Sequence, residues 1–118
     1  MRVDAAVAAG VAREAIIVDP GIGFAKQAGH SWSVLSHLDA APLLALDRPL
    51  LVGPSRKSFL QQAVGERPAA ERDPATAAAV AAAVLLGAHA IRVHDVAGMV
   101  QVARVADMIT TTRVQPVP

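Results

Sequence analysis

Residues 50–60 read LLVGPSRKSFL, in which an apolar run ends at Gly53 and two adjacent cations follow. Continuous apolar runs of this length are typical of parallel strands that are covered on both faces. We predict strands at 15–19 (AIIVD), 49–53 (PLLVG) and 90–94 (AIRVH). Helical patterns alternate with these runs, so the sequence predicts an α/β fold built from βα units with right-handed connections.

The segments between the strands predict the helices. These span 3–12, 31–46, 56–64, 73–87 and 95–108. Asp73 followed by Pro74 is a favourable N-cap and first-turn pair, and Gly87 suits a helix end. The stretch 109–118 continues neither pattern, so we predict a flexible tail.

Three parallel strands are few, and both outer ones would have open edges. We therefore expect the chain to be part of a larger α/β fold, either a fragment or a segment that needs strands from another chain. At 118 residues it can form one modest core. The hydrophobic fraction is 53% but aromatic residues make up only 3%, so each buried side chain contributes little burial.

The charge balance and the absence of cysteine argue against several classes of function. The chain has 11 Lys and Arg against 10 Asp and Glu, which gives no overall field for nucleic acid or a membrane surface. It has no cysteine, which excludes disulfides and thiolate metal sites and agrees with a reducing compartment. Without a signal-like start or a long apolar segment, the sequence predicts a cytoplasmic protein.

Chemistry-bearing residues follow the first strand in DPGIGFAK (19–26). The carboxylate of Asp19 has two acceptor oxygens, which suit the paired N–H donors of a flat heterocycle. The alternative interpretation is that Asp19 only stabilises a turn, because Asx-turns are common. Gly21 and Gly23 allow the backbone to turn tightly next to a ligand.

The other two strand ends carry cations. Lys57 and Ser58 begin a predicted helix, where a cation opposes the helix dipole unless an anion or an acceptor-rich ligand is present. Arg92 and His94 are two residues apart, so they project from one side of a strand and suit phosphate oxygens. The alternative for Lys57 and the adjacent Arg56 is that they are solvated surface cations beside a turn. The alternative for His94 is a structural role.

The remaining candidates favour structural roles. The three other histidines have no metal-ligand spacing, which favours surface or capping roles for His30, His37 and His89. Trp32 and Met99 are predicted to pack in the core. The sequence thus predicts no metal site within this chain.

Four motifs, DPGIGFAK, LLVGPSRKSF, ERDPAT and IRVHDV, together resemble dihydropteroate synthase. The resemblance runs over 5–108 and implies that 1–108 is the carboxyl-terminal portion of a pterin-binding domain. That portion is a partial TIM (β/α)8 barrel, three of eight strands with their helices, namely strands six to eight. The chain has Ala25 where the family commonly has Gly, and Ser31 where it often has Asn.

The resemblance implies a transferase of folate biosynthesis and a sulfonamide target. It would condense 6-hydroxymethyl-7,8-dihydropterin diphosphate with p-aminobenzoate, giving 7,8-dihydropteroate and diphosphate. Asp19, Lys57 and Arg92 would bind the pterin, and Arg92 and His94 the diphosphate. Lys57, Arg92 and His94 would be the catalytic residues.

By the same resemblance, Phe24, Lys57 and Ser58 would bind p-aminobenzoate, and Arg56 would serve the loop structurally or in handling anions. The family pairs the diphosphate with Mg²⁺ through an asparagine that lies outside this chain. We expect the isolated chain to be inactive, and to form a homo-oligomer or to need the other barrel strands. Two alternatives are a truncated, non-catalytic homologue that binds a pterin, an anion or a partner, and a pterin-binding methyltransferase, against which SRKSF argues.

Overall fold

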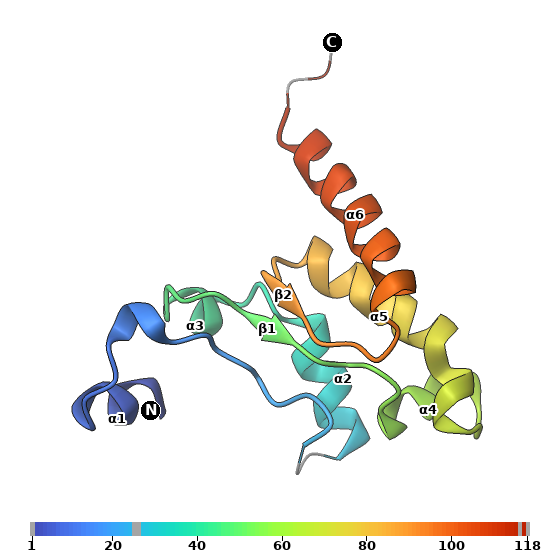
Figure 1. The fold of residues 1–118 in the computed structure, drawn as a ribbon, viewed down its shortest axis with the longest axis horizontal. Helices are drawn as coiled ribbons and strands as arrows, with labels where there is room; N and C mark the ends of the chain where they lie inside the picture. Colours follow the sequence, from blue (N-terminus) through green and yellow to red (C-terminus); the bar gives the residue numbers. More distant parts are fainter. Residues whose placement is uncertain (1, 25–26, 116, 118) are drawn as a thin grey trace.

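The computed structural model describes residues 2–24, 27–115 and 117. Short parallel strands lie at its centre, and helices pack on them or extend from them (Figure 1). The elements are α1 Arg2–Ala8, η1 Arg13–Ala15, α2 Ala28–Ser36, α3 Ala41–Leu44, β1 Leu51–Val52, η2 Ser58–Leu60, α4 Gln61–Val64, η3 Ala69–Arg72, α5 Asp73–Leu85, β2 Ala90–Ile91 and α6 Val96–Arg113.

The sheet has the predicted parallel order. β1 and β2 pair in parallel, with Leu51 opposite Ala90. On the other side, Val18 forms a single parallel bridge to Leu50. The Val18 amide donates to the Pro49 carbonyl at 2.8 Å, and the Leu51 amide donates to the Val18 carbonyl at 2.8 Å. The three predicted strands are therefore neighbours in chain order, and the α/β class is confirmed.

Each strand is shorter than predicted. The segment 15–19 contributes only the bridge at Val18, because η1 occupies its start and Pro20 follows its end. Pro49 has no N–H group and cannot donate to a neighbouring strand. Pro54 likewise ends the pairing beyond β1.

The predicted helix 31–46 is divided in two, which corrects that prediction. α2 ends at Ser36, and His37 leaves the helical conformation with φ −128° and ψ 35°. Pro42 lies in the first turn of α3, where its absent N–H is tolerated. In the interior of one continuous helix it would have removed a hydrogen bond and clashed with the preceding turn.

The predicted helix 56–64 also begins later than expected. Arg56 has φ 57°, in the left-handed region, and cannot belong to a right-handed helix. Lys57 is extended, with ψ 148°, and the chain turns into η2 only at Ser58. Arg56 and Lys57 therefore lie in a loop before the helix.

α5 and α6 depart from the predicted helices at one end each. Asp73 is not an N-cap, because it is the first residue of α5 and Arg72 precedes the helix without a side-chain cap. Gly87 has φ 103° just beyond α5, as its predicted role requires. α6 continues to Arg113, so 109–113 are helical and do not belong to a tail.

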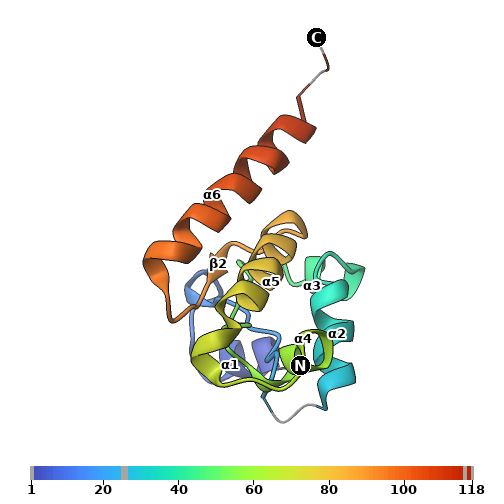
Figure 2. The same ribbon diagram turned by 90° about the vertical axis from the view of Figure 1, so that its right-hand side faces the viewer.

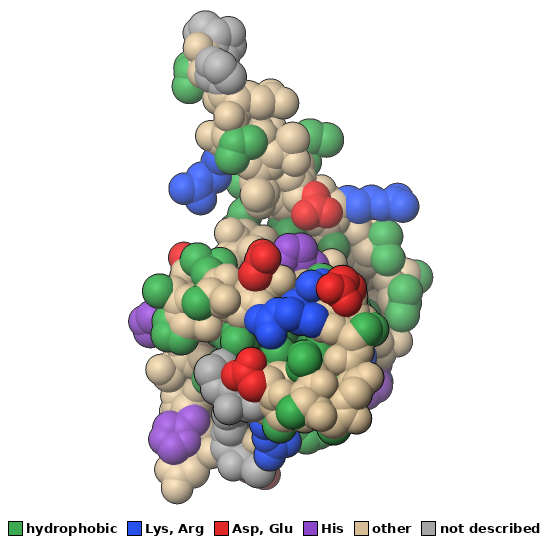
Figure 3. Space-filling model, turned by 90° about the vertical axis from the view of Figure 1, so that its left-hand side faces the viewer, with side chains coloured by type: hydrophobic (Ala, Val, Ile, Leu, Met, Phe, Trp, Pro, Cys, Tyr) green, Lys and Arg blue, Asp and Glu red, His purple; other side chains and the backbone are tan. Residues whose placement is uncertain are grey.

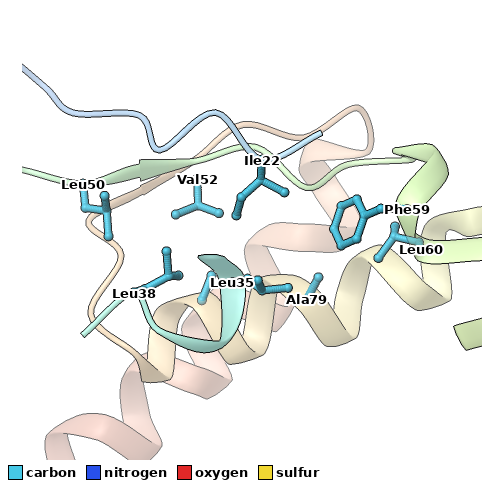
Figure 4. Packing of buried hydrophobic residues seen from close by; sticks show 9 residues of the cluster. Ile22, Leu35, Leu38, Leu50, Val52, Phe59, Leu60 and Ala79 are labelled. Carbon is cyan, nitrogen blue, oxygen red and sulfur yellow. The ribbon is translucent and has the colours of Figure 1, made fainter. Parts of the chain in front are cut away.

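The main core lies between the strands and the helices α2 and α5 (Figure 4). Its buried residues are Ile22, Leu35, Leu38, Leu50, Val52, Phe59, Leu60, Ala79 and Ala83. Trp32 packs edge-on against Phe59, with ring centroids 4.9 Å apart. A second cluster between α5 and α6 contains the buried Met99, whereas Trp32 is partly buried and packs against the first cluster, so both have the packing roles predicted for them.

Apolar surface remains exposed at both edges of the sheet. Ile17 is 58% exposed beside the Val18 bridge. On the other side, a hollow of about 460 Å³ between β2 and α6 is lined by Ile91, Val93 and Val96, among others. α6 packs against α5 along its first part, and its carboxyl-terminal part extends away from the other elements (Figure 2). This exposure agrees with the open edges predicted for the outer strands, and the homo-oligomer stays a prediction.

The surface charges are mixed. One face shows acidic and basic side chains next to one another, with apolar side chains between them (Figure 3). This distribution agrees with the near balance of charges in the sequence. Within 2–24, 27–115 and 117, none of the helices has the length and apolar character that spanning a membrane requires.

Candidate functional site

The three strand ends bring Asp19, Lys57 and Arg92 together. Arg92 Nη2 lies 3.9 Å from Asp19 Oδ2. Lys57 Nζ lies 4.0 Å from the centroid of the Phe24 ring, and Arg92 Cζ lies 5.7 Å from the same centroid. The structure thus brings these three side chains together at one end of the parallel strands. It produces a site with one carboxylate, two cations and one aromatic ring.

Asp19 has the turn-stabilising role that the sequence offered as the alternative, and its second oxygen remains directed toward Arg92. Its Oδ1 accepts a hydrogen bond of 2.7 Å from the Gly21 amide, which is the geometry of an Asx-turn. Its Oδ2 faces Arg92. The turn therefore fixes the carboxylate while leaving one oxygen toward the cations.

Phe24 presents its ring to solvent, with 55% of the residue exposed. An exposed aromatic residue next to two cations offers a ligand both an apolar face and positive charge. The sequence placed Phe24 in the site, and its position beside Lys57 agrees with that. The departure noted at Ala25 lies outside the described residues.

The Lys57 side chain packs against the loop that contains Gly21 and Gly23. Its ammonium donates a hydrogen bond to the Ile22 carbonyl. Burial lowers the pKa of Lys57 below its ordinary value, and the nearby Arg92 lowers it further, while Asp19 partly offsets these effects. An incoming acceptor or anion would relieve the repulsion between the two cations.

Ser31 supports the loop that contains Gly21 and Gly23. Sequence reasoning noted this residue only because the family often has Asn at its position. It is completely buried, and its Oγ accepts a hydrogen bond of 3.1 Å from the Gly23 amide. A single serine inside a predicted helix carries no sequence signal of a partner in another segment, so this role could not be predicted.

Arg56 points away from the site and holds the loop to α5. Its Nε and Nη2 bind the two oxygens of Asp73 at 2.9 and 3.1 Å. Its amide donates to Thr76 Oγ1 at 2.9 Å, and its carbonyl accepts from Arg72 at 2.7 Å. Of the two roles considered for Arg56, the structure supports the structural one. These contacts explain how a left-handed residue is stabilised directly before Lys57.

The Arg56 pair should make stability depend on pH. The guanidinium lowers the pKa of Asp73 below its ordinary value of 3.8, mainly through their hydrogen bond. A carboxyl whose folded pKa is depressed stabilises the fold above its unfolded pKa, and this contribution is lost as pH falls through the folded pKa. We expect Asp73→Asn to lower the free energy of unfolding near neutral pH, and the difference from the parent to shrink as pH falls below 3.8.

Urea unfolding across this pH range measures the effect. Asp39→Asn, at an exposed position, is the matched control and should leave the free energy of unfolding near neutral pH unchanged. A constant difference between Asp73→Asn and the parent at every pH would contradict the ion-pair explanation.

β2 ends at Ile91, so Arg92 and His94 follow the strand and do not both lie within it, as the predicted strand at 90–94 required. The Arg92 amide donates to the Val52 carbonyl at 3.0 Å, which continues the sheet pairing. His94 contacts Ser55, a buried residue that sequence reasoning missed. Ser58 is exposed at the start of η2, directly after the Lys57 loop.

The other histidines have the local roles that the sequence favoured. His37 follows α2, and its Nδ1 lies 2.8 Å from the Ser33 carbonyl. His89 Nδ1 accepts the Leu50 amide at 3.1 Å. His30 is exposed on α2. Across the described part of the chain, no three His, Cys, Asp or Glu side chains form a group suited to a metal ion.

Comparison with known proteins gives one consistent family. The model of the family described as pterin binding enzyme matches residues 1–94. The dihydropteroate synthase of Synechocystis sp. is 45% identical over 108 residues, which cover 92% of this chain and 37% of that protein. The chain thus spans little more than a third of that relative's length.

Solved structures of dihydropteroate synthases are also similar to this chain. The dihydropteroate synthase of Yersinia pestis has a TM-score of 0.85 at 35% identity, covering 93% of this chain and 50% of that one. That of Xanthomonas albilineans, in complex with 7,8-dihydropteroate, has a TM-score of 0.84 at 32% identity, covering 98% of this chain and 42% of that one. Because the family model matches most of the sequence and the fold agrees, the chain belongs to the pterin-binding enzyme family.

Proposed function

We propose that this chain forms strands six to eight of a (β/α)8 barrel and supplies part of the active site of a dihydropteroate synthase. The observation that carries the proposal is the convergence of Asp19, Lys57 and Arg92 beside the exposed Phe24 ring. Its dihydropteroate synthase relatives support the reaction. The substrates would be 6-hydroxymethyl-7,8-dihydropterin diphosphate and p-aminobenzoate.

The pterin would lie against the Asp19 end of the site. A pterin edge carries adjacent N–H donors, which the free oxygen of Asp19 accepts, and it carries acceptors that the Lys57 ammonium reaches. The Arg92 guanidinium is planar and packs on flat rings. These three groups together favour a flat heterocycle that has donors and acceptors on one edge.

The p-aminobenzoate would lie between Phe24 and the Lys57 side chain. The exposed ring of Phe24 and the aliphatic part of Lys57 give it two apolar contacts. Ser58, exposed at the start of η2, would donate a hydrogen bond to its carboxylate.

The diphosphate would be bound by Arg92 and His94, which act as donors to its oxygens. The amine nitrogen forms a bond to the methylene carbon, the carbon–oxygen bond to diphosphate breaks, and the amine loses one proton to water. Neutralising the leaving group lowers the barrier, so the protein contributes charge and positioning and needs no nucleophile of its own.

The resemblance to the family also implies Mg²⁺, which would neutralise diphosphate charge when bound. Within the described residues there is no group of three metal-ligating side chains. The groups proposed to meet the diphosphate are cationic or imidazole donors, whereas Mg²⁺ prefers oxygen ligands. We therefore assign Mg²⁺ no ligand in this chain, and no step above passes through it.

A chimera tests the proposal. The segment of the Synechocystis enzyme that aligns with this chain is replaced by this chain, and the product is measured with both substrates. We expect formation of 7,8-dihydropteroate and diphosphate. Arg104→Ala, on the exposed side of α6, is the matched control and should leave the rate unchanged.

The outcome also separates the alternatives. A folded chimera that binds pterin without forming product would contradict the enzymatic role and favour the non-catalytic binding module. Methyl transfer from a methylated pterin, without use of p-aminobenzoate, would favour a pterin-binding methyltransferase instead.

A further inference from the structure

Ser55 is a buried hydroxyl that the proposed reaction does not use directly. It follows β1, lies directly before Arg56, and is 7% exposed. Its Oγ accepts a hydrogen bond of 3.0 Å from the His94 amide and lies 2.6 Å from His94 Nδ1. One hydroxyl thus contacts both the backbone and the ring of a residue that is 39 positions away in sequence.

The donor and acceptor properties of the groups determine which atom donates in the contact between Ser55 Oγ and His94 Nδ1. A backbone amide can only donate, so the Ser55 oxygen is the acceptor in the first contact. Its single proton remains available, and the short oxygen–nitrogen distance indicates a hydrogen bond to Nδ1. Among the described residues, Ser55 Oγ has hydrogen-bond partners only in His94. If Nδ1 carried the proton, the buried hydroxyl would receive two donors while its own proton had no acceptor there.

We propose that Ser55 is a positioning residue that holds neutral His94 in the tautomer with its proton on Nε2. Nδ1 is then occupied inside the loop, and Nε2–H is the donor presented on the exposed side of the ring. This donor suits an oxyanion, and its use on the diphosphate rests on the proposed function. The tautomer itself depends only on the Ser55 contacts.

Two other histidines serve as internal references. His37 Nδ1 faces the Ser33 carbonyl, which can only accept, so a neutral His37 must carry its proton on Nδ1. His89 Nδ1 accepts the Leu50 amide, so a neutral His89 must carry its proton on Nε2. We expect His94 to resemble His89 and to differ from His37.

Nitrogen NMR of the chain tests this at about pH 8 to 9, where an ordinary histidine is neutral. In the parent, the ring nitrogens of His94 should report protonated Nε2 and unprotonated Nδ1. In Ser55→Ala the spectrum should move toward a mixture of tautomers, and Ser55→Thr, which keeps the hydroxyl, should restore the parent spectrum. A protonated Nδ1 in the parent would overturn the proposal without any variant.

The chimera gives the second measurement. Ser55→Ala should raise KM for the pterin diphosphate roughly 2- to 12-fold while leaving the affinity for 6-hydroxymethylpterin unchanged, as expected for one neutral hydrogen bond. Equal losses for both ligands would overturn the positioning role. If the chimera forms no product with any variant, the proposed function fails, and the NMR spectra still decide the tautomer.

Discussion

Lys57→Ala should reduce product formation by the chimera roughly 30- to 150-fold, because a ligand acceptor loses its charged partner in a partly desolvated site. Burial lowers the pKa of Lys57 and the neighbouring Arg92 lowers it further, while Asp19 partly offsets both effects. Affinity for the pterin should fall together with turnover. Both are measured by titrating the variant with 6-hydroxymethylpterin and by assaying 7,8-dihydropteroate.

His94→Ala is the matched comparison for this variant. It should leave the affinity for a pterin without diphosphate unchanged but weaken binding of the diphosphate ester, since His94 lies at the proposed diphosphate end. Normal turnover of Lys57→Ala would contradict its role. Equal loss of affinity for both pterins in the two variants would contradict the division of roles between Lys57 and His94.

Gly23→Ala should reduce turnover by a factor on the order of 100 without removing any functional group, because misplacement by about 1 Å has effects of this size. Gly23 has φ 78°, where a Cβ is strained, and a Cβ there would overlap Lys57 Cδ and lie 3.2 Å from Cγ. The Lys57 side chain would have to leave its place across the loop. The measurement is the rate of product formation by the chimera at saturating substrates.

Gly29→Ala is the control for this variant, because a Cβ at Gly29 would meet nothing within 4 Å. It should retain the parent rate. The double variant Gly23→Ala and Lys57→Ala supplies a sharper test, since both changes act through one side chain. It should be no slower than Lys57→Ala alone, and additive losses would contradict displacement of Lys57 as the cause.

Sequence reasoning recovered the strand order and the residues that meet at the strand ends. Both follow from one rule, since the carboxyl ends of parallel strands lie at one edge of a sheet. Asp19, Lys57 and Arg92 each stand just after or within an apolar run, so their positions along the chain were sufficient to bring them together. Their contacts to substrates stay predictions.

The contacts that support these residues were not predictable in the same way. Asp73 precedes a proline and reads as an N-cap, yet Arg56 binds its carboxylate because a left-handed turn directs that side chain to α5. Ser55 and Ser31 contact residues of other segments, and a lone serine carries no sequence signal of such a partner. The end of α6 was missed because the threonines of its last turns have low helix propensity. Thr110 and Thr112 instead donate to carbonyls one turn earlier, at 3.0 and 2.8 Å.

The small side chains of α5 have a consequence for how this family member can change over evolution. The small side chains of Ala79 and Ala83 let α5 lie close to the sheet. Thr76 of α5 is also buried, and its Oγ1 accepts a hydrogen bond from the amide of Arg56, the residue before Lys57. A larger residue at either alanine would push α5 outward and carry Thr76 with it. Under the proposed function, selection for substrate geometry would therefore act on these core positions, so that mutational tolerance inside this domain would be limited by catalysis as well as by folding.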